Sequence, residues 1–114
     1  MIFVTGGTGL LGSHLLIELA KGDVPIRAIY RSDKKKKELS ALFNYYFGDS
    51  WKGYLDRIEW LKGDILDIPF LQESMEGCSE VYHCAGMVSF HRKDFNKLIN
   101  INRNGTANIV NIAL

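Results

Sequence analysis

The sequence contains little of what marks several classes of protein. It has two cysteines among 114 residues, and its formal net charge is +1. Cys78 and Cys84 cannot form a disulfide framework and fit no common zinc spacing, so we expect reduced thiols, no metal and a cytoplasmic protein. A net charge near zero gives no overall field that would attract nucleic acid or a membrane surface.

Long apolar runs are also missing. No run reaches the roughly 18 residues of a membrane span. Met1 leads directly into a strand-like segment, which leaves no room for a signal peptide in the given sequence. The chain is 46% hydrophobic and 24% charged, the balance of a folded globular protein rather than a disordered one. We expect one domain, spanning residues 1–114.

Apolar segments separated by glycines predict strands and helices in alternation. The expected strands are 1–5, 25–30, 58–61 and 81–84, and the expected helices are 10–21, 34–47, 68–75 and 94–114, with an irregular connection over 48–56. Alternation of this kind predicts an α/β fold, a doubly wound parallel sheet with the strand order 3-2-1-4. In the first helix, Leu11, Leu15 and Leu19 recur at helical spacing and would form one apolar face.

A glycine triplet follows the first predicted strand at once, with the spacing Gly6-x-x-Gly9-x-x-Gly12. Gly6 would let the chain turn sharply, Gly9 would let a pyrophosphate approach the main chain, and Gly12 would let the helix pack closely. The amides of Leu10 and Leu11, in the first helical turn, would then face the phosphates. A strand before the triplet and a helix after it form the setting that a dinucleotide site requires.

Two other interpretations of this turn have to be weighed. A nucleotide triphosphatase loop shares the glycine spacing from Gly7 to Gly12, but Ser13 stands where that loop requires lysine. An ordinary glycine turn is the other alternative, and an isolated triplet would not distinguish it from a binding site. The strand and helix around the triplet favour the dinucleotide site.

The end of the second predicted strand bears on the type of dinucleotide. An acid there accepts the ribose 2′-hydroxyl of NAD, whereas an arginine suits the 2′-phosphate of NADP. This strand ends at Tyr30-Arg31-Ser32, and the first acid is Asp33. Arg31 can form a planar fork to phosphate, and Ser32 offers a hydroxyl. We therefore predict NADP, with NAD as the alternative. The lysines at 34–37 could simply be the solvated start of a basic helix, but this explanation fits Arg31 less well.

Four motifs occur in one order along the chain. They are TGGTGLLG at 5–12, GDILD at 63–67, VYHCAG at 81–86 and NRNGTAN at 102–108. Together they resemble the N-terminal part of the extended short-chain dehydrogenase/reductases, the NAD-dependent epimerase/dehydratase family. The resemblance implies a Rossmann fold and hydride transfer between NAD(P) and an alcohol, a ketone or a nucleotide sugar.

The resemblance also implies roles for individual residues. Asp64 would accept a hydrogen bond from the adenine amino group, and the Ile65 amide would meet the ring. Ala85 and Gly86 would line the passage toward the nicotinamide ribose, and Asn102 would support the active-site region. A plain turn at Asp64 and a structural hydrogen bond from Asn102 are the alternatives.

Two further residues have structural interpretations. His83 ends an apolar strand and is expected to be a hydrogen-bonded core histidine rather than a ligand. Gly105 lies inside a predicted helix, where glycine costs about 1 kcal/mol relative to alanine. Close packing against a neighbouring element is the expected reason for Gly105.

The family's Ser/Thr and Tyr-x-x-x-Lys follow a fifth strand that this sequence does not contain. We therefore expect the chain to be the cofactor-binding part of a longer enzyme that acts on a small molecule, and to be inactive alone. A non-catalytic dinucleotide-binding regulatory or scaffold protein is the alternative. A third interpretation is a self-associating module, a homo-oligomer formed through the open edge of the fourth strand.

Overall fold

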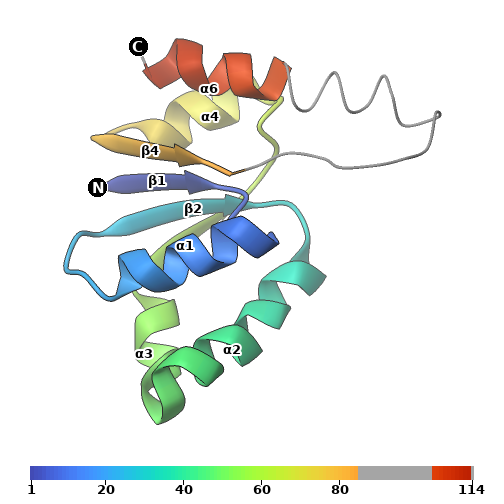
Figure 1. The fold of residues 1–114 in the computed structure, drawn as a ribbon. Coiled ribbons are helices and arrows are strands. Elements are labelled where there is room, and N and C mark those ends of the chain that lie inside the picture. Colours follow the sequence, from blue (N-terminus) through green and yellow to red (C-terminus); the bar gives the residue numbers. More distant parts are fainter. Residues whose placement is uncertain (85–103, 114) are drawn as a thin grey trace.

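The computed structural model describes residues 1–84 and 104–113 (Figure 1). The predicted start of the last helix at Asp94 lies outside these residues. Ala85, Gly86 and Asn102 lie outside them as well, so their predicted roles stay predictions.

Within these two ranges, four parallel strands form one sheet in the order β3-β2-β1-β4. Their bounds are Ile2–Thr5 for β1, Ile26–Tyr30 for β2, Ile58–Lys62 for β3 and Glu80–His83 for β4. In the register Tyr30 lies opposite Lys62, and Thr5 lies opposite His83, so the carboxyl ends of all four strands meet at one edge. The predicted fold class and strand order are confirmed.

Helices cover both faces of this sheet (Figure 1). The helices α1 (Leu10–Ala20), α2 (Asp33–Phe47) and α3 (Trp51–Asp56) lie on one face, and α4 (Ile68–Met75) and α6 (Thr106–Ala113) lie on the other. The side chains of β1 alternate between the two layers, because Ile2 and Val4 join the first apolar core and Phe3 joins the second. Each face therefore has a core of its own.

The prediction of an irregular connection over 48–56 was wrong. This segment forms a short 3-10 turn, Gly48–Ser50, followed by α3. Glycine, aspartate and serine favour turns locally, but tertiary contacts decide here. The Tyr54 ring stacks on Phe47 with centroids 4.0 Å apart, and the Arg57 guanidinium after α3 donates to Gly22 O at 2.8 Å.

The predicted apolar face of α1 was also wrong. The helix buries Gly12, Ser13, Leu16, Ile17 and Ala20, whereas Leu11 is 74% exposed. Apolar residues occur almost all round α1, so their spacing alone does not choose a face. The close approach of Gly12 to the glycine turn sets the rotation of the helix, and positions four and eight residues later then face the sheet.

Helix α4 has the predicted bounds, 68–75, and both of its ends have a local cause. Asp67 is the N-cap, and its carboxylate accepts the Phe70 N–H at 3.2 Å. Gly77, after the end of the helix, has φ of +79°, a conformation that favours glycine. Within the described residues, no helix is long and apolar enough to cross a membrane, and Cys78 and Cys84 are both free.

Candidate functional site

The glycine turn lies at the carboxyl end of β1 and leads into α1. Gly6 has φ of +68°, as the predicted sharp turn requires. The Gly9 N–H donates to Gly6 O at 3.0 Å, which folds the turn back on itself. A Cβ at Gly12 would lie 1.9 Å from Gly6 O, so only glycine allows α1 to approach the turn this closely.

The first turn of α1 leaves main-chain donors open. The first helical hydrogen bond runs from Ser13 N–H to Gly9 O at 2.9 Å, so the amides of Leu10, Leu11 and Gly12 have no carbonyl within the helix to bind. Leu10 is 83% exposed and Leu11 is 74% exposed, and the first turn holds no acidic residue. The positive end of the helix therefore faces solvent, which suits an anion.

Gly9 differs from the other two glycines of the triplet. Its φ of −80° and ψ of 175° are extended values that any residue adopts. Among the described residues, the one atom within 4 Å of a Cβ at Gly9 would be Gly6 O, at 3.4 Å. Neither the fold nor the backbone requires glycine there, so the bare main chain at Gly9 leaves space on the outer side of the turn.

Gly7 has a structural role that the sequence analysis missed. A Cβ at Gly7 would lie 2.7 Å from Leu16 Cδ1. The second glycine of the Gly-Gly pair therefore lets Leu16 pack under the turn. The pair itself was the only signal for this contact in the sequence.

Two predicted site residues from neighbouring strands come together at this edge. Arg31 follows β2 and Asp64 follows β3, and Arg31 Nε lies 3.8 Å from Asp64 Oδ2. Their side chains are 57% and 41% exposed, so water or a ligand can reach both. The guanidinium is held loosely near the place where the sequence predicts adenosine.

The polar groups next to Arg31 already have closer partners within the protein. The Ser32 hydroxyl oxygen caps α2 by accepting the Lys35 N–H at 3.3 Å, so the predicted phosphate contact could use only its O–H. Lys62 Nζ lies 2.7 Å from Asp33 Oδ2. The hydrogen bond from Lys62 holds the pKa of Asp33 below its usual value, and the same bond raises the pKa of Lys62. The nearest acid after β2 thus remains charged and paired with a lysine.

Asp64 forms the turn that the alternative interpretation predicted. Its Oδ1 accepts the Leu66 N–H at 3.0 Å, and its main-chain oxygen accepts the Asp67 N–H at 3.0 Å. Its other carboxylate oxygen, Oδ2, is the one near Arg31. The turn therefore leaves one oxygen of Asp64 available at the edge of the sheet.

Helix α6 reaches this turn from the second face of the sheet. Asn108 Nδ2 donates to Ile65 O at 3.1 Å, a contact that the sequence analysis missed. A Cβ at Gly105 would lie 2.3 Å from Ile65 Cδ1, so the predicted close packing of this glycine is confirmed. No local pattern could indicate the Asn108 contact, because its partners are 43 residues apart.

His83, at the end of β4, connects this strand with β1 and α6. Its Nδ1 lies 2.6 Å from Thr5 Oγ1, and its Nε2 lies 2.8 Å from Thr106 Oγ1. The predicted hydrogen-bonded histidine is confirmed, although its side chain is half-buried rather than fully in the core. Burial lowers the pKa of His83 and raises the pKa of the Cys84 thiol.

The partial burial of His83 predicts a pH dependence of stability. A histidine whose pKa is lower in the folded state than its unfolded value of 6.5 binds protons more readily when unfolded. The free energy of unfolding should therefore fall as the pH drops below about 6.5. Urea unfolding at pH 7.5 and pH 5.5 measures this fall, and His83→Gln should reduce it. An equal fall in both proteins would show that other groups cause it.

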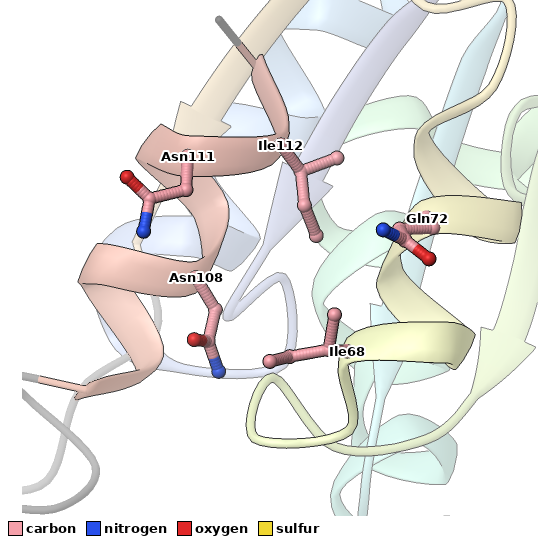
Figure 2. Close-up of a pocket in the computed structure, with 5 residues that line it drawn as sticks. All are labelled: Ile68, Gln72, Asn108, Asn111 and Ile112. Atoms are coloured by element: carbon pink, nitrogen blue, oxygen red, sulfur yellow. The ribbon is translucent and has the colours of Figure 1, made fainter.

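The groove between α4 and α6 is separate from the glycine turn. It has a volume of about 420 Å³ and is lined by Ile68, Gln72, Asn108, Asn111 and Ile112 (Figure 2). None of the described residues predicted to bind cofactor lines it. The candidate site is instead the open edge of the sheet, where the turn, Arg31 and Asp64 are presented.

Fold and site together define a Rossmann-type α/β domain with an open glycine turn at its first strand. Residues 2–114 match the NAD dependent epimerase/dehydratase family, and the chain belongs to that family. It is 31% identical over 110 residues to a bifunctional dihydroflavonol 4-reductase/flavanone 4-reductase from Malus domestica, covering 96% of this chain and 30% of that one. The chain thus spans only 27–32% of the length of the curated relatives that it matches.

Solved structures have the same fold. The thiolation-reductase di-domain of an archaeal non-ribosomal peptide synthetase matches with a TM-score of 0.79 and 26% identity, over 97% of this chain and 25% of that chain. A UDP-glucose-4-epimerase from Stenotrophomonas maltophila, solved with bound NAD, matches with a TM-score of 0.75 and 20% identity. That match covers 97% of this chain and 32% of the epimerase.

Proposed function

We propose that this chain is the cofactor-binding part of an oxidoreductase that transfers hydride between NADP(H) and an alcohol, ketone or nucleotide-sugar substrate. The observation that carries the proposal is the exposed, acid-free start of α1 behind the glycine turn. Main-chain amides and a helix dipole at the carboxyl edge of a parallel sheet bind diphosphates in such folds. The likeness to a plant reductase supports the reductase chemistry.

Different residues around the glycine turn would bind different parts of the cofactor. The amides of Leu10, Leu11 and Gly12 would hold the diphosphate. The Arg31 guanidinium would leave Asp64 and bind the 2′-phosphate. The free Oδ2 of Asp64 would accept the adenine amino group, and the Ile65 amide would meet the ring. The bound nicotinamide would supply or receive the hydride.

The second half of the cofactor would extend toward the end of β4. We place Ala85 and Gly86 along the nicotinamide ribose and Asn102 behind the reacting groups. Tyr30 and Lys34 have the spacing of a catalytic pair, but Tyr30 ends β2 and Lys34 lies in α2, so they do not share a helix face. We therefore propose that residues 1–114 bind cofactor without turning over substrate.

Titration of NADPH into the protein and a Gly9→Val variant tests the diphosphate site. Valine tolerates the extended backbone at this position, so the variant should fold, while its side chain fills the space outside the turn. We expect the Kd for NADPH to rise about tenfold or more, the loss of one or two good hydrogen bonds. Quenching of protein fluorescence gives the Kd, and thermal unfolding confirms that the variant folds.

The outcomes of this titration separate clearly. A parent protein that binds neither NADPH nor NADH at millimolar concentration would refute the proposed function. A folded Gly9→Val protein that binds NADPH as tightly as the parent would show that the cofactor lies elsewhere. Weakened binding with an unchanged unfolding midpoint supports the site at the turn.

A further inference from the structure

We infer that Asn108 of α6 is a positioning residue for the adenine end of the cofactor, because it fixes the carboxylate of Asp64 through a single peptide group. The inference rests on the proposed function and deepens it. Asn108 itself would touch neither adenine nor phosphate. Its effect would pass through the main chain between Ile65 and Leu66.

The peptide between Ile65 and Leu66 is held at both of its polar ends. Its carbonyl oxygen accepts the Asn108 amide at 3.1 Å, and its N–H donates to Asp64 Oδ1 at 3.0 Å. The peptide is planar and trans, so its C=O and N–H point in opposite directions. Fixing the carbonyl from α6 therefore also fixes the direction in which the N–H meets Asp64.

The consequence for Asp64 is that its two oxygens have different tasks. Oδ1 is occupied by the Leu66 N–H, whereas Oδ2 is left near Arg31, with the side chain 41% exposed. An amino group on a purine ring would meet Oδ2, the acceptor that remains. If the peptide rotated, Oδ1 would lose its donor, and the carboxylate would no longer be held in one orientation.

Helix α6 is well placed to hold this peptide. Ile65 is only 5% exposed and packs with Leu71 and Ile109 in the second core. Gly105, one turn before Asn108, lets the Ile65 side chain lie directly against the helix. Packing thus fixes the distance between α6 and the turn, and the Asn108 amide fixes the peptide orientation.

Asn111 offers a matched control for Asn108. Both residues belong to α6 and line the groove between α4 and α6 (Figure 2). Leucine has nearly the shape of asparagine but cannot donate. Asn108→Leu removes the bond to Ile65 O, whereas Asn111→Leu makes the same chemical change one turn further along α6. Asn108→Ala provides a second, smaller replacement in case the leucine variant does not fold.

The readout compares NADPH with its hypoxanthine analogue, which carries an oxygen in place of the adenine 6-amino group. We expect the parent to bind NADPH more tightly than the analogue. Asn108→Leu should weaken NADPH binding about three- to tenfold, the worth of one hydrogen bond, and affect the analogue much less. Asn111→Leu should keep the parent's discrimination between the two ligands.

A double-mutant cycle with Asp64→Ala tests the path of the effect. If Asn108 acts through Asp64, the Asn108→Leu change should cost no further NADPH affinity in the Asp64→Ala background. The inference is overturned if Asn108→Leu and Asn108→Ala leave NADPH binding unchanged, or weaken both ligands equally. A parent that fails to bind NADPH at all refutes the proposed function instead, so the two failures are distinguishable.

Discussion

Replacing Arg31 with alanine is expected to weaken NADPH binding about tenfold to a hundredfold and to leave NADH binding nearly unchanged. A hydrogen bond to a charged group contributes about 1.5–3 kcal/mol, and only NADPH offers the 2′-phosphate. The Arg31 side chain is 57% exposed and lies 3.8 Å from Asp64, so it can exchange this carboxylate for a phosphate. Fluorescence titration of both dinucleotides into parent and variant measures the change in preference.

A loss of stability in Arg31→Ala should be too small to account for the expected change in NADPH binding. An exposed ion pair contributes at most about 1 kcal/mol, so the variant should unfold close to the parent's midpoint. Lys21→Ala is the charge-matched control, because Lys21 follows the far end of α1 and pairs with Glu18 at 2.9 Å. It should leave the preference for NADPH intact. Equal affinity of the parent for NADPH and NADH would reject the 2′-phosphate assignment.

The glycine turn and the strand order could be predicted because each depends on short-range requirements. A positive φ at Gly6 and the spacing of Gly12 from it follow from the local path of the chain. Short apolar strands alternating with helices leave few topologies once crossovers are right-handed. The start of the helix predicted at 68–75 is also local, because the capping residue Asp67 and its partner Phe70 are only three residues apart.

Other features depend on contacts between distant segments. The helix α3 forms although its sequence favours turns, since Trp51, Tyr54 and Leu55 pack against the first core. The buried side of α1 is set by the approach of Gly12 to Gly6, which a helix with apolar residues all round does not reveal. Tertiary packing overrides the local pattern in both cases.

In the candidate site, too, some features follow from the local sequence and others depend on contacts between distant segments. The sequence indicated Arg31 and Asp64 separately: Arg31 because it directly follows a predicted strand, and Asp64 through the resemblance of GDILD to a family motif. Their separation of 3.8 Å depends on the pairing of β2 with β3. The occupation of Asp64 Oδ1 by its own turn, and the support of that turn by Asn108, appear only once α6 has packed on the second face.

The second large effect is expected from Gly12→Ala. The added Cβ would lie 1.9 Å from Gly6 O and 3.0 Å from Gly7 Cα, and main-chain atoms cannot move aside as a flexible side chain can. The start of α1 must shift away from the turn. We expect the free energy of unfolding to fall by about 3 kcal/mol, the upper end for an overpacked site, and the melting temperature to fall by roughly 10–20 °C.

Gly53→Ala is the matched control for Gly12→Ala, since Gly53 also lies within a helix. A Cβ there would have no neighbour within 4 Å in the part of the chain that the structure describes. Removing a helical glycine from open surface should stabilise α3 by up to about 1 kcal/mol. Opposite signs for the same substitution would show that contact, not helix propensity, governs Gly12. If Gly12→Ala melted at or above the parent's temperature, α1 could not rest on the turn, and its amides could not hold a diphosphate in the proposed position.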